Sequence, residues 1–253
     1  MLFALEFGKL FRRKFNYLFI IILSLINFAF VYKLDTLATF YDKSILDIIF
    51  SIILKVNMVI VIFIMGLNYI YSYREDYISK VNVLLEIRKK KSTRDILAIL
   101  ANLIYFLVYY VIVIACFIGI IFLLKRNIFE ELKTLMLNVN TAGSYAAMLV
   151  LLFVFANLIF LLALTLFNNT NLAISFSLLF FIGGEVIANM IKSRFSVPAE
   201  RVDNSVLTIF TKSFNLLNQN ITFNLGNFLP LALNMLGLIV VIVIVRLMKK
   251  IIG

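Results

Sequence analysis

The most densely charged stretch of the sequence is residues 74–95, REDYISKVNVLLEIRKKKSTRD. The chain has 24 Lys and Arg and 13 Asp and Glu residues, and eleven of these charged side chains lie in that stretch. Its apolar residues, among them Leu84 and Leu85, recur at helical spacing, which indicates a short amphipathic helix. From Ser92 to Asp95 the pattern is that of a serine N-cap followed by an acidic residue. Such a segment can bind a partner protein or lie on a lipid surface.

Two further ionisable residues, Lys55 and Glu185, interrupt runs that are otherwise apolar. Lys55 lies eight residues after Asp47, and Glu185 lies seven residues before Lys192. At about 1.5 Å of rise per residue, both would lie roughly 10 to 12 Å below the outer surface of a membrane. A charge at that depth needs a partner or water. The two side chains could therefore pair, or they could face a cavity that accepts a charged amphipathic cargo.

Simpler roles for these residues stay open. The long Lys55 side chain could extend to the lipid headgroups, and Glu185, which follows two glycines, could lie at a water-filled bend. Asn57 is assigned to the same predicted translocation pathway as Lys55 and Glu185, although interhelical hydrogen bonding is the usual role of Asn inside a membrane span. Transport measurements on Lys55→Ala and Glu185→Gln would distinguish these hypotheses.

The elements that must hold these residues are long apolar runs. The chain is 63% hydrophobic and only 15% charged, with a mean hydropathy of +1.05, so it has too little polar surface for a soluble domain. Apolar runs of about 17 to 25 residues can cross roughly 30 Å of hydrocarbon as helices. We therefore predict an all-α membrane protein whose single transmembrane domain covers residues 1–253. Its six expected spans are residues 15–32, 48–70, 96–124, 142–167, 172–191 and 228–245.

The cations of the loops predict the orientation. With the N-terminus in the cytoplasm, the cytoplasmic segments hold 14 Lys and Arg residues and the outer loops hold nine, which places both termini and residues 74–95 inside. That charged loop could be a solvated segment whose helix faces lipid. However, its four acidic residues, Glu75, Asp76, Glu86 and Asp95, would weaken attachment to the negative inner leaflet. A protein partner with cations of its own is the alternative that we favour.

Shorter amphipathic segments flank the expected spans. Residues 1–14 have Phe7 on an apolar face and Lys9 and Arg13 on the opposite face, which is typical of an interfacial helix along the inner leaflet, anchored by Arg12 and its neighbours. On the outer side, residues 127–140 predict another interfacial helix. Between spans five and six we expect a helix that is capped by Asp203. Residues 168–171 leave room only for a very short turn between spans four and five.

Several classes of protein are excluded by what the sequence lacks. It contains no His, which removes intramembrane proteases of the HExxH type, and it has no GxxxxGK[ST] loop with which to bind nucleotide phosphates. No catalytic dyad is visible, so we do not expect an enzyme. The net charge of +11 fits a basic surface beside anionic lipid better than a nucleic-acid site. Any ATP and Mg²⁺ would have to be bound by another subunit.

The order of these features resembles the ABC-2-type permeases, which are membrane subunits of ABC exporters with the ABCG-like, type V fold. The likeness covers the whole chain. It includes the N-terminal elbow LEFGKLFRRK, six spans, the charged loop between spans two and three, and a re-entrant or amphipathic outer segment between spans five and six. Residues 73–100, YREDYISKVNVLLEIRKKKSTRDILAIL, resemble the coupling region of the family. The usual Gly-Thr of that helix and the Pro before the Arg are absent, and Lys residues occupy their place.

The resemblance implies a function and a set of partners. It implies a permease that a separate ATPase subunit drives, in a pair with a second copy or a related permease, within a bacterial plasma membrane. The composition is most similar to permeases for amphipathic peptides, such as those of the staphylococcal phenol-soluble modulin exporter and of lantibiotic immunity, which serve toxin secretion and self-protection. An ion-gradient-driven transporter and a non-transporting immunity or scaffold protein are the alternatives. The residues implied to contact the ATPase are Arg74, Glu75, Asp76, Tyr77, Lys80, Leu84, Leu85, Glu86 and Arg88.

Overall fold

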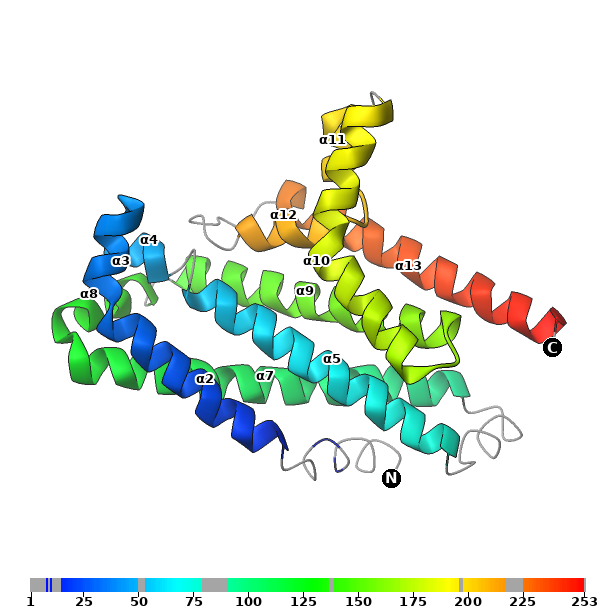
Figure 1. Cartoon of the computed structure of the whole chain (residues 1–253), viewed down its shortest axis with the longest axis horizontal. Helices are drawn as coiled ribbons and strands as arrows, with labels where there is room; N and C mark the ends of the chain where they lie inside the picture. Colours follow the sequence, from blue (N-terminus) through cyan, green and yellow to red (C-terminus); the bar gives the residue numbers. More distant parts are fainter. Residues whose placement is uncertain are drawn as a thin grey trace.

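A computed structural model describes residues 8, 10, 15–49, 53–78, 91–136, 139–195, 198–216 and 225–252. Within these ranges every regular element is a helix, which confirms the predicted all-α class (Figure 1). Five helices are long and apolar enough to cross a membrane, namely α5 (Leu54–Ile78), α7 (Lys91–Leu124), α9 (Val139–Leu166), α10 (Thr170–Phe195) and α13 (Leu225–Ile252). A sixth span is formed if α2 (Phe15–Tyr32) and α3 (Leu34–Tyr41), which meet at 64°, count as one bent pair.

The second and third helical spans differ from the expected bounds. The predicted start at residue 48 falls at the end of a separate short helix, α4 (Ile45–Ile48), where the Ser44 Oγ accepts a 3.1 Å hydrogen bond from the backbone N–H of Asp47. In contrast, α5 continues eight residues past the expected end at 70. Helix α7 begins at Lys91, five residues before the apolar run at 96 and one residue before the predicted cap at Ser92. Hydropathy marks where lipid contact ends, but backbone hydrogen bonding carries a helix farther.

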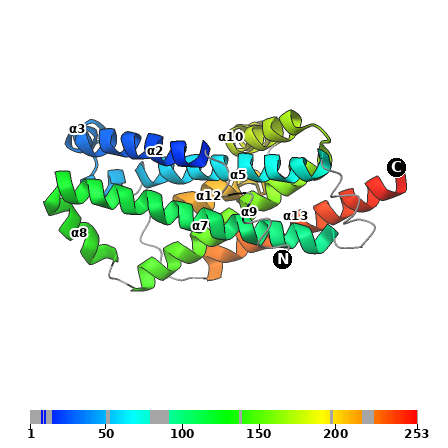
Figure 2. The same cartoon turned by 90° about the horizontal axis from the view of Figure 1, so that it is seen from below.

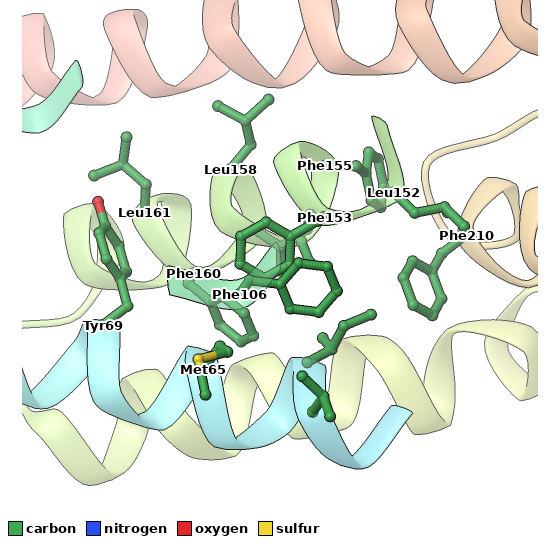
Figure 3. Close-up of a cluster of buried hydrophobic side chains, with 14 of the residues drawn as sticks. Met65, Tyr69, Phe106, Leu152, Phe153, Phe155, Leu158, Phe160, Leu161 and Phe210 are labelled. Atoms are coloured by element: carbon green, nitrogen blue, oxygen red, sulfur yellow. The ribbon is translucent and has the colours of Figure 1, made fainter. Parts of the chain in front are cut away.

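Helix α9 lies in the middle of the bundle, because it is apolar on every side. It packs against α5, α7, α10 and α13 (Figure 1). Figure 3 shows its side chains Phe153 and Phe160 between neighbouring helices. Phe153 stacks on Phe106 of α7 with the ring centres 3.7 Å apart. Phe160 lies over Gly66 of α5, where an added Cβ would be only 2.1 Å from the ring Cζ. The glycine is therefore required for this close approach.

A second apolar cluster lies at the end of the bundle formed by α3, α4 and the end of α7. It includes Leu34, Ile48 and Phe117. The amphipathic helix expected at 127–140 is observed as α8 (Arg126–Met136), and its apolar side buries Ile128 and Leu132 in this cluster. In Figure 2, α2 and α10 lie along one face of the bundle with α5 beneath them, and α8 lies on the other side.

The segment after α10 contains two short helices, α11 (Ala199–Asp203) and α12 (Ile209–Leu216). The predicted helix after Asp203 therefore starts later than expected, and the prediction that Asp203 caps it is wrong. Asp203 is the last residue of α11 and forms a salt bridge with Lys192 of α10. The apolar face of α12 was predicted correctly, since Ile209 and Phe214 are buried.

Asparagine side chains link the antiparallel helices α2 and α5 at two levels. The Asn68 Nδ2 donates to the Asn16 Oδ1 at 2.6 Å, and the Asn57 Nδ2 donates to the Asn27 Oδ1 at 2.8 Å. On each helix the two asparagines are eleven residues apart, which is about three turns and returns the side chains to nearly the same face. All four are buried. The interhelical hydrogen bonding expected for Asn residues in the spans is thus present.

Candidate functional site

The charged loop lies between the end of α5 and the start of α7. Helix α5 has 25 residues and α7 has 34, which correspond to about 38 Å and 51 Å of length. Both exceed the roughly 30 Å thickness of a hydrocarbon core. The end of α5 and the start of α7 lie at the same end of the bundle as the turn between α9 and α10 and the end of α13 (Figure 1). We call this end of the molecule the loop end.

Only part of the predicted partner-binding set can be placed. Glu75, Asp76 and Tyr77 belong to the last turns of α5, but their side chains lie outside the described residues, as does that of Lys55 near the start of the same helix. The predicted pairing of Lys55 with Glu185 therefore stays a prediction. The remaining predicted elbow and loop residues fall wholly outside the described ranges, and they are Phe7, Lys9, Arg12, Arg13, Lys80, Leu84, Leu85, Glu86 and Arg88.

Arg74, in contrast, has a defined position on α5. Its Nε donates a 3.1 Å hydrogen bond to the Oγ1 of Thr170, the first residue of α10. The turn before Thr170 is as short as the sequence predicted, since α9 ends at Leu166. The Asn169 Oδ1 accepts a 2.8 Å hydrogen bond from the backbone N–H of Asn171, which stabilises the turn. The helix that leads into the charged loop is thus joined directly to the start of α10.

A buried ion pair joins the other helix of the loop to α13. The Arg246 Nη1 of α13 lies 2.7 Å from the Oδ2 of Asp95 on α7. Beside it, the Arg94 guanidinium is buried and lies 4.5 Å from the ring centre of Tyr73 on α5. A buried carboxylate requires such compensation, because transferring it out of water is costly.

Helix α13 also reaches the turn between α9 and α10. The Lys249 Nζ donates to the backbone oxygen of Leu166 and to the Asn168 Oδ1, each at 3.3 Å. Together with the contacts of Arg74 and Asp95, this connects α5, α7, α10 and α13 at the loop end. Chemically, these contacts are hydrogen bonds and an ion pair that hold the helices of the loop end together.

The pairing of Asp95 with Arg246 was not predicted from the sequence, in which Asp95 fits a helix cap and Arg246 is one of the cytoplasmic cations. The two residues are far apart in the sequence, and nothing local connects them. The available signal was the acidic residue at the start of one apolar run and the basic residue at the end of another, since opposite charges at the same membrane depth tend to pair.

The predicted translocation residues occupy different surroundings. Asn57 is buried and bonded to Asn27 as described above, and its assignment to a pathway remains a prediction. Glu185 is exposed on α10 and borders a cavity of about 360 Å³ between α10 and α12. We call it the α10–α12 cavity. Its lining residues are Glu185, Asn189, Lys192, Asp203, Thr208, Thr211, Lys212, Asn215 and Leu216.

Within the described ranges, no group of three or more His, Cys, Asp or Glu residues is arranged to hold a metal ion. The polar groups of these ranges include the loop-end contacts, the Asn pairs and the residues of the α10–α12 cavity. The sequence matches no protein-family model, and comparisons with curated proteins and with solved structures gave no match.

Proposed function

We propose that this chain is the membrane permease subunit of an ATP-driven exporter, and that residues 74–95 receive the ATPase subunit. The observation that supports this most directly is the connection at the loop end. On the helices at either side of the loop, Arg74 bonds to Thr170 of α10 and Asp95 pairs with Arg246 of α13. Force applied to the loop would therefore reach the two helices that are least buried among their neighbours.

The partners and cargo of this proposal follow from the resemblance. ATP and Mg²⁺ would be bound by the ATPase subunit, and two permeases, identical or related, would form the pathway between them. The cargo would be an amphipathic peptide such as a cytolytic or antimicrobial toxin. In this arrangement both termini and the loop end face the cytoplasm of a bacterial cell, and the α10–α12 cavity lies toward the outer side.

Purification of the tagged full chain from its native membrane tests the proposal. An ATPase chain should be recovered with it, and the purified complex should hydrolyse ATP. Reversing two adjacent acidic residues, Glu75→Lys with Asp76→Lys, should reduce recovery of the ATPase at least about tenfold, because like charges across an interface are strongly unfavourable. The matched control reverses the adjacent acidic pair of α8, Glu130→Lys with Glu131→Lys, and should leave recovery unchanged.

The alternatives predict different outcomes. An ion-gradient-driven transporter would purify without an ATPase, and a protonophore would abolish its transport. A scaffold or immunity protein would bind peptide without moving it. If the ATPase is recovered equally well with the Glu75→Lys and Asp76→Lys double variant, residues 74–95 are not the docking segment. The chain could then still belong to an ATP-driven complex that docks elsewhere.

A further inference from the structure

The α10–α12 cavity is bounded by two polar stripes that face each other. On α10, Glu185, Asn189 and Lys192 recur at intervals of four and three residues, so they share one side of the helix. The second stripe lies across the cavity, on α12 and the residue before it. It has the same spacing of three or four residues and consists of Thr208, Thr211, Lys212 and Asn215. The opposite side of α12 is apolar and buried in the core. The helix therefore presents its polar side to the cavity because its apolar side is anchored.

The walls of the cavity are held in place by backbone contacts. A Cβ added at Gly184 would lie 2.7 Å from the backbone oxygen of Leu207, so the glycine lets the segment before α12 approach α10 closely. From the other side, the Asn234 Nδ2 of α13 donates to the backbone oxygen of Asn204 at 2.8 Å. The Thr208 hydroxyl donates to the backbone oxygen of Val202. These contacts fix the spacing between the two polar stripes.

The charges of the cavity fall into one compensated pair and two groups that are available to a ligand. Lys192 and Asp203 neutralise each other in a salt bridge. The Lys212 Nζ donates to the Asn204 Oδ1 at 2.7 Å, which is a neutral partner and leaves its positive charge uncompensated. Among the residues that the structure describes, the Glu185 carboxylate has no hydrogen bond or ion pair. The cavity thus offers one free negative and one free positive group, with a net charge near zero.

We infer that the α10–α12 cavity is a binding site for a small zwitterionic group that carries a primary ammonium and a phosphate or carboxylate. The ammonium pairs with Glu185 and the anionic group pairs with Lys212, while Asn189 and Thr211 offer further hydrogen-bonding groups. A simple cation would leave Lys212 uncompensated, and a simple anion would leave Glu185 uncompensated. A volume of about 360 Å³ corresponds to roughly twelve water molecules at about 30 Å³ each, which is enough for a headgroup of this size.

Two sources could supply this chemistry, namely the headgroup of an aminophospholipid and a soluble zwitterion. Ile182 and Val186 of α10 have exposed apolar side chains and lie three residues before and one residue after Glu185. They would contact the acyl chains of a lipid whose headgroup occupies the cavity. Leu216 adds an apolar residue to the cavity lining. The site does not depend on the proposed exporter function, because its test uses this chain alone.

The test measures binding of phosphoethanolamine to the full chain in nanodiscs made only of phosphatidylglycerol, a lipid without an ammonium group. Saturable binding is expected for the unmodified chain. Glu185→Gln and Lys212→Gln should each weaken it by about tenfold or more, as expected when one charge-assisted hydrogen bond is lost. Glu130→Gln and Lys43→Gln, which remove exposed charges elsewhere, are the matched controls and should have no effect.

Phosphocholine and a change of lipid complete the test. Phosphocholine, whose quaternary ammonium cannot donate N–H hydrogen bonds, should bind more weakly than phosphoethanolamine. Nanodiscs that contain phosphatidylethanolamine should compete with the soluble probe if a lipid headgroup occupies the site, and unchanged binding there assigns the site to a soluble ligand. Since both variants alter exposed side chains, an unchanged elution volume checks folding. Absence of saturable binding, or equal binding by Glu185→Gln, would overturn the inference.

Discussion

The loop end and the α10–α12 cavity contain the same kinds of charged group in opposite arrangements. Each has a salt bridge whose basic side chain is 28% exposed, from Arg246 at the loop end and from Lys192 at the cavity. The acidic partners differ, because the Asp95 side chain is 4% exposed and that of Asp203 is 45% exposed. At the loop end polar contacts connect helices directly. At the cavity they border open space, so the first arrangement holds helices together and the second leaves charged groups accessible.

Breaking the buried ion pair should have the largest effect on stability. Arg246→Met leaves the Asp95 carboxylate buried without its α13 partner, and we expect a loss of about 3 kcal/mol in the free energy of unfolding. Unfolding in mixed detergent micelles measures it. Arg194→Met, which removes an exposed cation in the last turn of α10, is the control. If the two variants are equally stable, the Asp95 pair does not hold α7 against α13.

The second largest effect on stability is expected at the contact between Gly66 and Phe160 in the middle of the bundle. This contact lies between the loop end and the α10–α12 cavity, and changing it tests whether rigid packing joins those two regions. Gly66→Ala places a methyl group against the Phe160 ring and should cost about 1 to 3 kcal/mol through overpacking. Gly119→Ala, where no atom lies within 4 Å of the added Cβ, should be neutral or slightly stabilising because alanine favours a helix. Partial rescue of Gly66→Ala by Phe160→Leu would identify the ring as the cause, and no rescue would point to the backbone.

Removing the hydrogen bond between α5 and α10 should have a smaller effect on stability. Thr170→Val deletes the acceptor of the Arg74 Nε while keeping the shape of the side chain, and about 1 kcal/mol is expected. Thr93→Val, at an exposed position near the start of α7, provides the comparison. If Arg74 transmits movement from the charged loop, Thr170→Val should also lower cargo-stimulated ATP hydrolysis in the complex, although its stability changes little.

The smallest change is expected at the partly exposed pair of the cavity. Lys192→Gln should alter the free energy of unfolding by less than about 1 kcal/mol, because solvent screens an exposed pair. The same unfolding measurement applies. A cost equal to that of Arg246→Met would remove the distinction between the two regions and would indicate that the cavity is closed to water.

Much of the fold could be predicted because lipid imposes strict local rules. The apolar runs, the short turn at 168–171 and the amphipathic face of α8 each depend on neighbouring residues, and each was predicted. The early start of α7 was also indicated locally, by the cap pattern at Ser92. The extension of α5, the break before Leu54 and the true position of Asp203 depend on backbone hydrogen bonds and on packing between helices, which hydropathy does not record.

The site was less predictable for the same reason. The pairing of Asp95 with Arg246 and the facing polar stripes of α10 and α12 join segments that are distant in the sequence. One long-range feature did have a sequence signal, since Asn16 and Asn27 have the same separation as Asn57 and Asn68. In an antiparallel pair of helices, equal spacing brings both pairs opposite each other.

That equal spacing restricts how the molecule can change shape. If α2 slid along α5 by a single turn, the asparagines of both pairs would separate in the same step, and both hydrogen bonds would be lost together. Breaking them is unfavourable where lipid offers no replacement. We therefore expect α2 and α5 to move as one body.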